Sequence, residues 1–323
     1  MFAPGNQFHS NELPRIAITI GDAAGIGPEI VAKSLVDESL TTVCRPVVVG
    51  DASVIDIPEG IDVVDVHALG GRVEFGRVSA EAGRASGRYI EAAVALWKEG
   101  KVDAIATAPI NKASLNAGGY DFPGHTEFLA ALTGTKRFAM SFFADKLRVV
   151  LLSTHLSLVD AITRVTTENL VELIKFSNEQ LSSLLRRPVK LAVAGLNPHA
   201  SENGMFGSEE TEEMVPAVEH CRTELGIDVT GPYSPDTIFL RGYRGEFDGV
   251  IACYHDQATI AVKSLSFGTG VNVTLGLPLI RTSVDHGTAY DIAGKGVADE
   301  SSMKAAIRLA AQLASIKRES ASA

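Results

Sequence analysis

Side chains that can do chemistry are concentrated in residues 251–291, where apolar runs alternate with dense polar clusters. This alternation is typical of strands that deliver side chains to a cleft. The candidate site residues of the stretch carry imidazole, cationic, amide and carboxylate groups: His255, Asp256, Lys263, Asn272, Arg281, Asp285 and His286. Few stretches of ordinary core have this composition, so it predicts a binding or catalytic site.

Three histidines share one sequence context, because each directly follows an apolar, strand-like run: His155 in LLSTHLSL, His199 in LNPHASENG and His255 in ACYHDQ. A single histidine of this kind is usually a hydrogen-bonded loop residue. Three of them favour a shared site, and a metal ion is the commonest reason for imidazoles to converge. Three protein ligands would leave positions open, where a divalent ion acts as a Lewis acid on a substrate hydroxyl.

Lys263, Asn272 and Arg281 supply positive charge and hydrogen-bond donors. The planar fork of Arg281 suits a carboxylate or a phosphate. Lys263 is a candidate for anchoring phosphate, or for acid–base work if burial lowers its pKa. A lone lysine or arginine is most often a solvated surface charge, but the position of these residues after apolar runs favours a site.

Glycine-rich or capped turns follow two other predicted strands. GDAAGIGPEI (21–30) lacks the GxGxxG spacing of a dinucleotide fingerprint, so it favours a tight turn into a helix that starts at Pro28. An anion at the amide-rich helix start is the alternative. TAPINK (107–112) places Asn111 and Lys112 at the end of a strand, either as a capped helix start with a solvated lysine or as part of a site.

Two more segments are candidates for ligand contacts. FPGHTEF (122–128) places His125 and Thr126 at a helix N-terminus, where exposed amides suit a phosphate and Thr126 can cap the helix. DHGTAYDIAGKGVAD (285–299) is a flexible loop that can wrap a flat adenosine, or an ordinary connection to the last helix.

Composition is that of a globular α/β protein. The chain has 323 residues, 46% apolar content and a net charge of −10 without a basic block, which disfavours a nucleic-acid partner. Neither a signal peptide nor a membrane-spanning run is expected, and the N-terminal fourteen residues are predicted to be a loose tail. The three cysteines fit neither a zinc ribbon nor a disulfide framework, so a reducing, cytoplasmic location is predicted.

Hydrophobic periodicity predicts strands that alternate with helices. Strands are expected at 15–20, 46–50, 103–108, 189–196, 249–254 and 271–275, with an antiparallel hairpin around Asp145-Lys146. Helices are expected at 78–100, from 125 to 132, from about 156 to 186, at 208–225 and at 300–316. The fold class is therefore α/β with a hairpin inserted in the middle.

Signature stretches over about residues 16–295 resemble the 4-hydroxythreonine-4-phosphate dehydrogenase family. They are GDAAGIGPEI, TAPINK, PGHTEFLA, STHLSL, GLNPHASENG, YHDQ, GVNVTLGLPLIRTS and DHGTA. The resemblance implies the isocitrate and isopropylmalate dehydrogenase superfamily, with two α/β domains flanking a cleft and a homodimer. The domains would be 1–130 plus 265–323 on the cofactor side, and 131–264 with the metal ligands and the dimer interface.

The resemblance also implies roles for individual residues. His155, His199 and His255 would hold a divalent metal (zinc, magnesium, cobalt or manganese), shared between the two chains of the dimer. Lys263 and Asp256 are the candidate catalytic groups. The substrate would contact His125, Thr126, Lys263, Asn272 and Arg281. NAD or NADP would be held by a loop similar to the HGSAPDIAGKG-type loop of the superfamily, with contacts from His286, Gly287, Thr288 and Asp291.

The activity implied is oxidation, with decarboxylation, of 4-phosphooxy-L-threonine to 3-amino-2-oxopropyl phosphate in pyridoxal phosphate biosynthesis. Biosynthetic members usually read GDPAGIG, HAGEGG and HDQG, whereas this chain reads GDAAGIG, HASENG and HDQA. The stretch from Asn203 to Phe206 is more similar to a branch that acts on 4-phospho-D-threonate or 4-phospho-D-erythronate and gives dihydroxyacetone phosphate. More remote alternatives are a metal-dependent phosphohydrolase and a non-catalytic phosphate-ester binder.

Overall fold

The computed structural model describes residues 12–71, 73–266 and 268–319. The chain forms two compact units: unit 2 comprises residues 138–276, and unit 1 comprises the chain before and after it. The domain boundaries expected from sequence were 130/131 and 264/265, and the second of these falls inside a helix. Most of the predicted N-terminal tail lies outside the described residues.

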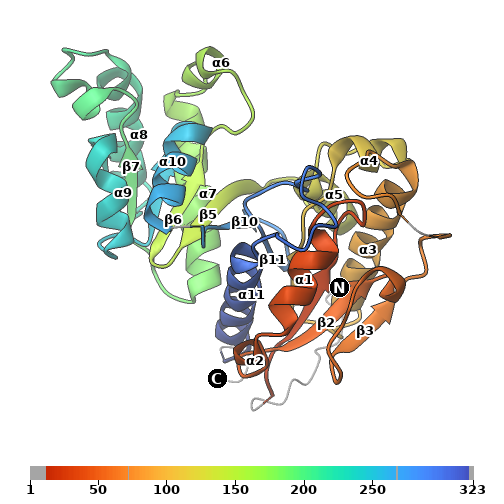
Figure 1. Cartoon of the computed structure of the whole chain (residues 1–323). Coiled ribbons are helices and arrows are strands. Elements are labelled where there is room, and N and C mark those ends of the chain that lie inside the picture. Colours follow the sequence, from red (N-terminus) through yellow and green to blue (C-terminus); the bar gives the residue numbers. More distant parts are fainter. Residues whose placement is uncertain (1–11, 72, 267, 320–323) are drawn as a thin grey trace. The chain divides into compact units, whose positions relative to one another are not determined.

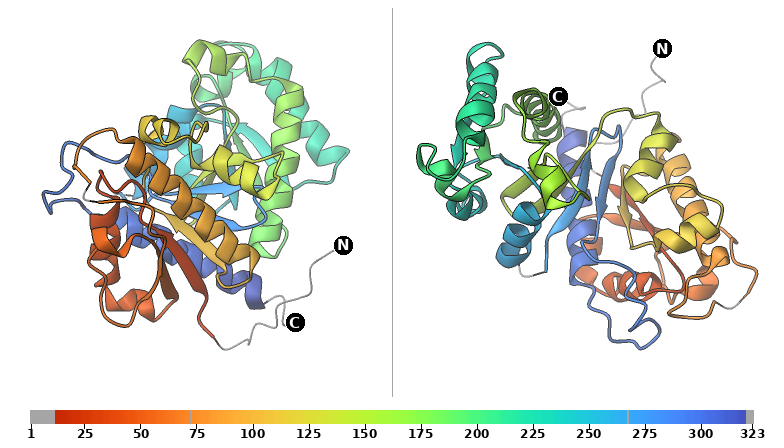
Figure 2. Two further views of the ribbon diagram at one scale, coloured as in Figure 1. Left: turned by 90° about the vertical axis from the view of Figure 1, so that its right-hand side faces the viewer. Right: turned by 90° about the horizontal axis from the view of Figure 1, so that it is seen from above.

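Unit 1 is built from parallel strands that are buried almost throughout, because Val, Ile and Ala fill β1, β2 and β4. Its strands are β1 (Arg15–Thr19), β2 (Arg45–Gly50), β3 (Asp62–Asp65), β4 (Ala104–Thr107) and β11 (Ile280–Ser283). Its helices are α1 (Gly27–Leu35), α2 (Glu38–Thr41), α3 (Ala80–Lys98), α4 (Lys112–Ala117), α5 (His125–Thr133) and α11 (Ser301–Glu319), with a 3-10 turn at Ala52–Val54. Helices α1 and α11 cover one face of the strands, and α3, α4 and α5 cover the other (Figures 1 and 2).

The strands of unit 1 run in the order β3-β2-β1-β4-β11, and every neighbouring pair is parallel. The carboxyl ends of β1, β4 and β11 therefore lie at the same edge. Those ends lead into the glycine-rich turn at 21–27, the TAPINK turn and the loop at 285–291. Ligands of open α/β sheets bind at this edge, so the topology brings three of the predicted motifs together.

Unit 2 opens with the predicted antiparallel hairpin of β5 (Ala139–Ala144) and β6 (Leu147–Leu151), whose tip residue Asp145 has a φ of 52°. The other strands are β7 (Leu191–Ala194), β8 (Val229–Tyr233), β9 (Gly249–Ala252) and β10 (Val271–Leu275). The helices are α6 (Leu158–Ile162), α7 (Thr167–Leu185), α8 (Val215–Thr223), α9 (Pro235–Tyr243) and α10 (His255–Ser266), with a 3-10 segment at Pro198–Glu202 and a π-helical turn at Glu210–Met214.

The strand order of unit 2 is β10-β5-β6-β9-β7-β8, and β6, β9, β7 and β8 are parallel. Helices α9 and α10 pack on these strands through one buried apolar cluster that includes Ile238, Phe239, Ala258 and Val262. Because β6, β9 and β7 are consecutive neighbours, their carboxyl ends present three successive loops at one edge. These loops carry His155, His255 and His199.

Several elements differ from those expected. Residues 251–291 contain not only strands but also helix α10, which begins at His255 and is separated from β9 by Cys253 and Tyr254. The helix expected over 156–186 is two helices, α6 and α7, because Thr166 starts a new one by accepting a hydrogen bond from the amide of Asn169. The helix expected over 208–225 begins with the π-helical turn. Strands β3, β8 and β11 and helix α9 were not predicted.

Candidate functional site

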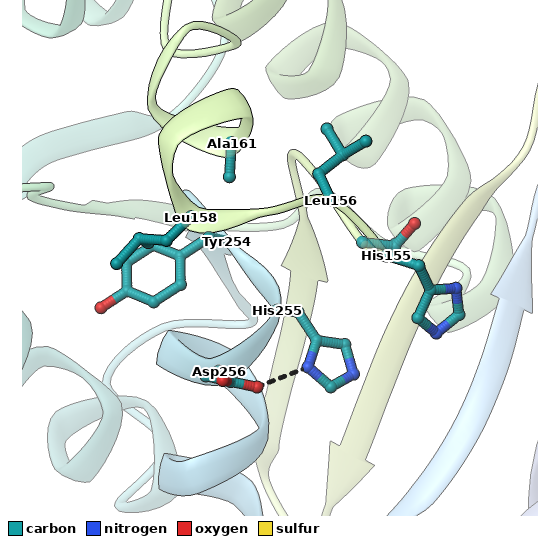
Figure 3. A pocket seen from close by; sticks show the side chains of 8 residues that line it. His155, Leu156, Leu158, Ala161, Tyr254, His255 and Asp256 are labelled. Atoms are coloured by element: carbon teal, nitrogen blue, oxygen red, sulfur yellow. Dashed lines mark hydrogen bonds and ion pairs between the residues drawn. The ribbon is translucent and has the colours of Figure 1, made fainter.

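Two of the three predicted metal ligands lie side by side in unit 2. The ring centroids of His155 and His255 are 5.6 Å apart, with an angle of 40° between the rings. Both residues line a pocket of about 300 Å³, and Figure 3 shows the two rings next to each other at its margin. Two imidazoles that bind one tetrahedral ion through nitrogens at about 2.0–2.1 Å have centroids roughly 5 Å apart. The spacing of this pair therefore suits a shared divalent ion.

A carboxylate orients one of these imidazoles. Oδ1 of Asp256 lies 2.7 Å from Nδ1 of His255, so that Nδ1–H donates to the carboxylate and Nε2 carries the lone pair (Figure 3). A carboxylate behind a histidine in this way fixes its tautomer and raises its basicity as a ligand. The donor set of His255, Asp256 and His155 thus fits a metal ion in its chemistry.

The third predicted metal ligand, His199, does not lie beside His155 and His255. Among the described residues no three histidine, cysteine, aspartate or glutamate side chains are gathered as a ready metal site. His199 is exposed, and its ring lies 6.5 Å from that of Phe206. It begins a run of five non-glycine residues with positive φ, which ends at Asn203 and has φ between 46° and 64°. Such angles are unfavourable for residues other than glycine, so the loop that carries His199 is held in a strained form.

Unit 1 contains a buried cation on β11, the strand that pairs with β4. Arg281 on β11 is 3% exposed, and its Nε and Nη2 donate to Oγ1 of Thr107 at 3.2 and 2.9 Å. Burial lowers the pKa of Arg281 to about 9, and the carboxylate of Glu127 acts in the opposite direction. A buried guanidinium whose pKa is lowered gains from a bound anion, so this position is suited to a carboxylate or phosphate.

His125 lies close enough to Arg281 for their charges to interact. Burial, and secondarily the positive charge of Arg281, hold the pKa of His125 well below its usual range, so the imidazole is neutral. Its Nε2 is buried and has no hydrogen-bond partner within the described parts of the chain. Helix α5 begins at this residue after Gly124, without a side-chain cap. The expectation that Thr126 caps the helix is therefore wrong, because Thr126 lies in the first turn and is buried.

The glycine turn and the loop at 285–291 are packed against each other. The amide of Ile26 donates to the carbonyl of Thr288 at 3.0 Å, and a Cβ at Gly25 would lie 2.8 Å from Thr288. The hydroxyl of Tyr290 donates to Oδ2 of Asp22 at 2.8 Å. The tight turn is thus confirmed, and Pro28 lies in the first turn of α1, which begins at Gly27.

The candidate cofactor residues in this loop differ in burial and in their hydrogen-bond partners. Thr288 is buried, and its carbonyl is already bonded to Ile26. Nε2 of His286 is buried without a hydrogen-bond partner in the described residues, while a Cβ at Gly287 would meet nothing within 4 Å. Asp291 is exposed. Nδ1 of His286 lies 3.0 Å from the carbonyl oxygen of Gly287, so Nε2 is the ring atom that a bound nucleotide could supply with a hydrogen bond.

The remaining predicted residues are Asn272, Lys263, Asn111 and Lys112. Asn272 lies on β10, and its Oδ1 is buried without a partner among the described residues. Lys263 is exposed on α10, so the argument that it directly follows a strand is wrong. Asn111 caps α4 by accepting from the amide of Ser114, as the capped helix start predicts, and Lys112 is exposed.

Sequence reasoning missed four residues that organise these regions: Asp22, Thr107, Gln257 and Tyr290. Asp22 and Gln257 fall within the motifs GDAAGIG and YHDQ, in which the glycines and the histidine carry the more specific chemical signal. Thr107 and Tyr290 act through contacts that join distant parts of the chain, which no local pattern indicates.

The chain is 47% identical to the D-threonate 4-phosphate dehydrogenase of Cupriavidus necator over 94% of this chain and 98% of that protein. It is 45% identical to the 4-hydroxythreonine-4-phosphate dehydrogenase of Desulforapulum autotrophicum, over 94% and 96%. A crystal structure of the 4-hydroxythreonine-4-phosphate dehydrogenase of Klebsiella pneumoniae has a TM-score of 0.85 and 42% identity, over 94% of this chain and 99% of that one.

These relatives are dehydrogenases, and the chain is an enzyme of that class. The chain belongs to the family described as pyridoxal phosphate biosynthetic protein PdxA, whose sequence profile matches residues 19–310. The resemblance drawn from the signature stretches and the expected α/β class are confirmed. No helix of the described residues is both long and apolar enough to cross a membrane.

Proposed function

We propose that the chain catalyses the NAD(P)-dependent, metal-dependent oxidation of a four-carbon acid that carries a 3-hydroxyl and a 4-phosphate, with D-threonate 4-phosphate as the first candidate. The observation that carries the proposal is the pair of imidazoles, His155 and His255, at a spacing that suits one ion. The relative from Cupriavidus necator is named for this substrate. The stretch from Asn203 to Phe206, which departs from the biosynthetic pattern, also supports the choice.

A second candidate is 4-hydroxythreonine 4-phosphate. It is supported by the family description and by the name of the relative from Desulforapulum autotrophicum. The two substrates differ at C2, where one has a hydroxyl and the other an amine. D-erythronate 4-phosphate differs from the first candidate only in stereochemistry and belongs to the same proposal.

The reaction proposed balances without another reactant. The C3–H bond breaks and its hydride reduces the nicotinamide, while the C3 hydroxyl loses its proton and becomes a ketone. The resulting β-keto acid loses carbon dioxide, and a proton returns to C2. D-threonate 4-phosphate would give dihydroxyacetone phosphate, and 4-hydroxythreonine 4-phosphate would give 3-amino-2-oxopropyl phosphate.

Different side chains would bind the metal ion, bind the substrate and transfer the proton. A divalent ion, when bound, supplies a Lewis acid that lowers the pKa of the substrate hydroxyl and stabilises the enolate left by decarboxylation. His155, His199 and His255 would hold the ion, and Asp256 would orient His255. Arg281, with His125, Thr126 and Asn272, would bind the anionic substrate, because each offers a buried polar group or a charge. Lys263 is the candidate for phosphate contact or for proton transfer.

The cofactor and assembly are part of the same proposal. NAD or NADP would contact His286, Gly287, Thr288 and Asp291, supported by the unpartnered Nε2 of His286. A homodimer is supported by exposed apolar side chains around the pocket of His155 and His255, namely Leu156, Leu158, Val159 and Ile162. A cytoplasmic location stays a prediction.

One experiment tests the activity against its rivals. The purified chain is incubated with divalent metal, with NAD or NADP, and with each of the two substrates; reduced nicotinamide and inorganic phosphate are both measured. The proposal expects reduced nicotinamide and no phosphate, with faster turnover on D-threonate 4-phosphate. Faster turnover on 4-hydroxythreonine 4-phosphate would select the second candidate. Phosphate release without reduced nicotinamide would replace the proposal with a phosphohydrolase.

A further inference from the structure

The three loops that carry or lead to the candidate metal ligands His155, His199 and His255 are joined by hydrogen bonds between their backbones and a few side chains. The loops follow β6, β9 and β7, which are neighbours in that order. The loop after β9, which carries His255, is therefore flanked by the other two. Its spacing from each flanking loop determines how far apart the imidazoles can be.

Gln257 spans the gap between two of these loops. Its Oε1 accepts from the amide of Cys253 at 2.8 Å, two residues before His255. Its Nε2 donates to the carbonyl of Gly195 at 2.7 Å, on the segment that leads from β7 to His199. One contact thus closes the turn that places His255 at the start of α10, and the other joins that turn to the neighbouring loop.

A side-chain amide satisfies both contacts at once, whereas an ionised carboxylate or a thioether does not. The backbone of Cys253 offers a donor and that of Gly195 offers an acceptor, so the bridging group must present one acceptor and one donor at the same end. A glutamate has the same shape but would place a carboxylate oxygen against the carbonyl of Gly195. A methionine has similar length but no strong donor or acceptor.

Gly195 in turn supports the strained loop of His199. A Cβ at Gly195 would lie 3.0 Å from both Cα and Cβ of Ala200, so the two segments are in close contact. The buried carboxylate of Glu210 accepts from the amide and from Nδ2 of Asn197 at 2.7 and 2.8 Å. A shift of Gly195 would therefore be transmitted to the backbone of His199.

The third loop is attached on the other side. The hydroxyl of Ser153 donates to the carbonyl of Cys253 at 3.0 Å, and the amide of Leu152 donates to the carbonyl of Ala252 at 2.8 Å. Ser153 lies two residues before His155. The backbone of Cys253 is thus bonded through its amide to Gln257 and through its carbonyl to Ser153.

We infer that Gln257 is a positioning residue that sets the separation of the His255 and His199 loops, and with it the affinity of the chain for a divalent metal. The inference rests on the proposed metal site. Neighbours that orient metal ligands typically change metal affinity by about 10–100-fold when they are replaced. Gln257 itself would bind neither the metal nor the substrate.

The test measures metal affinity directly on the purified full-length chain, by titrating metal-free protein with Co²⁺ and recording both the dissociation constant and the visible absorption of the bound ion. Gln257→Glu and Gln257→Met are expected to weaken Co²⁺ binding by about tenfold or more and to alter the absorption bands. Gln180→Met, on α7 of the same unit, makes the same chemical change elsewhere and should leave both unchanged. Ser153→Ala is a second variant, in case a Gln257 variant does not fold, and should weaken binding in the same direction.

The outcomes separate this inference from the proposal beneath it. His255→Ala is measured in parallel. If His255→Ala binds Co²⁺ as the wild type does, the proposed metal site is wrong and the inference falls with it. If His255→Ala loses Co²⁺ while the folded Gln257 and Ser153 variants keep wild-type affinity and absorption, the metal site stands and the positioning role of Gln257 is overturned.

Discussion

The hydroxyl of Tyr290 donates a hydrogen bond to Oδ2 of Asp22 at 2.8 Å, between residues 268 positions apart. Asp22 is fully buried, and its Oδ1 accepts from the amide of Ala24 in the glycine turn. The oxygen of Tyr290 also lies 2.9 Å from Oγ of Ser114 on α4. The loop at 285–291, which is the candidate cofactor loop, is therefore locked onto the turns that follow β1 and β4.

Tyr290→Phe should weaken the attachment of the loop at 285–291 to the glycine turn, because it removes the hydrogen bond from Tyr290 to Asp22. The variant leaves a buried carboxylate without one of its donors, and hydrogen bonds to charged groups typically contribute about 1.5–3 kcal/mol. We expect the free energy of unfolding to fall by about that amount and the Michaelis constant for the nicotinamide cofactor to rise, with little change in the constant for substrate. Urea unfolding and steady-state kinetics measure both. Tyr243→Phe in unit 2 is the control, and an unchanged cofactor constant in Tyr290→Phe would contradict the role of the lock.

Asp22→Asn should change how stability depends on pH. Burial raises the pKa of Asp22 above its ordinary value of 3.8, outweighing its hydrogen bonds to Tyr290 and Ala24. The folded chain therefore holds the carboxyl proton of Asp22 more tightly than the unfolded chain does. As pH rises above 3.8, ionisation of Asp22 lowers the free energy of unfolding of the wild type. The asparagine variant has no carboxyl to ionise at this position, so its free energy of unfolding does not fall for this reason.

The stability of Asp22→Asn relative to wild type should thus increase as pH rises from about 4, and level off above the folded-state pKa. Urea unfolding at a series of pH values measures the difference, with Asp121→Asn on the surface as the control. A difference that shrinks as pH rises would mean that the pKa of Asp22 is lowered in the folded chain.

Arg281→Lys separates shape from charge. Lysine keeps the positive charge but loses the fork that reaches Thr107 and, in our proposal, the anionic substrate. A charge-assisted contact contributes about 1.5–3 kcal/mol, so we expect the specificity constant to fall by roughly 10–100-fold, and Arg281→Met to be worse. Steady-state kinetics, with the substrate and the cofactor varied in turn, measure the effect. A defect confined to the Michaelis constant for the cofactor would contradict the role of Arg281 in substrate binding.

Replacing any of the three candidate metal ligands should have a common effect. His155→Ala, His199→Ala and His255→Ala are each expected to remove tight metal binding and nearly all turnover, because ligand geometry and Lewis acidity are lost together. His220→Ala, an exposed histidine on α8, is the matched control. Metal content after dialysis and turnover in chelator-treated buffer are measured. Full activity of His199→Ala would remove that residue from the site, in keeping with its separation from the other two here.

The structural features that could be predicted from the sequence are those set by a local pattern of apolar and polar residues. Buried parallel strands read as apolar runs, so the placement of His155, His199 and His255 at the ends of β6, β7 and β9 could be predicted. Helix α10 was missed because its polar first turn, His255 to Gln257, is separated from β9 by only two residues, Cys253 and Tyr254. The run of positive φ that begins at His199 is only weakly indicated by residue type, since three of its five non-glycine members, Ala200, Ser201 and Glu202, are not residues that favour that region.

Contacts across the chain could not be predicted in the same way. The bonds from Tyr290 to Asp22 and from Gln257 to Gly195 depend on which strands become neighbours. The burial of Arg281 and the exposure of Lys263 likewise depend on whether the residue falls on β11 or on α10. A single sequence gives the residue types but not these neighbours.

The most direct test of the account is the formation of reduced nicotinamide by metal-free protein, with D-threonate 4-phosphate and NAD or NADP, before and after a divalent metal is restored. The account predicts that reduced nicotinamide forms only after metal is added, together with an equal amount of carbon dioxide. No reduced nicotinamide from either D-threonate 4-phosphate or 4-hydroxythreonine 4-phosphate, or equal turnover with and without metal, would contradict it.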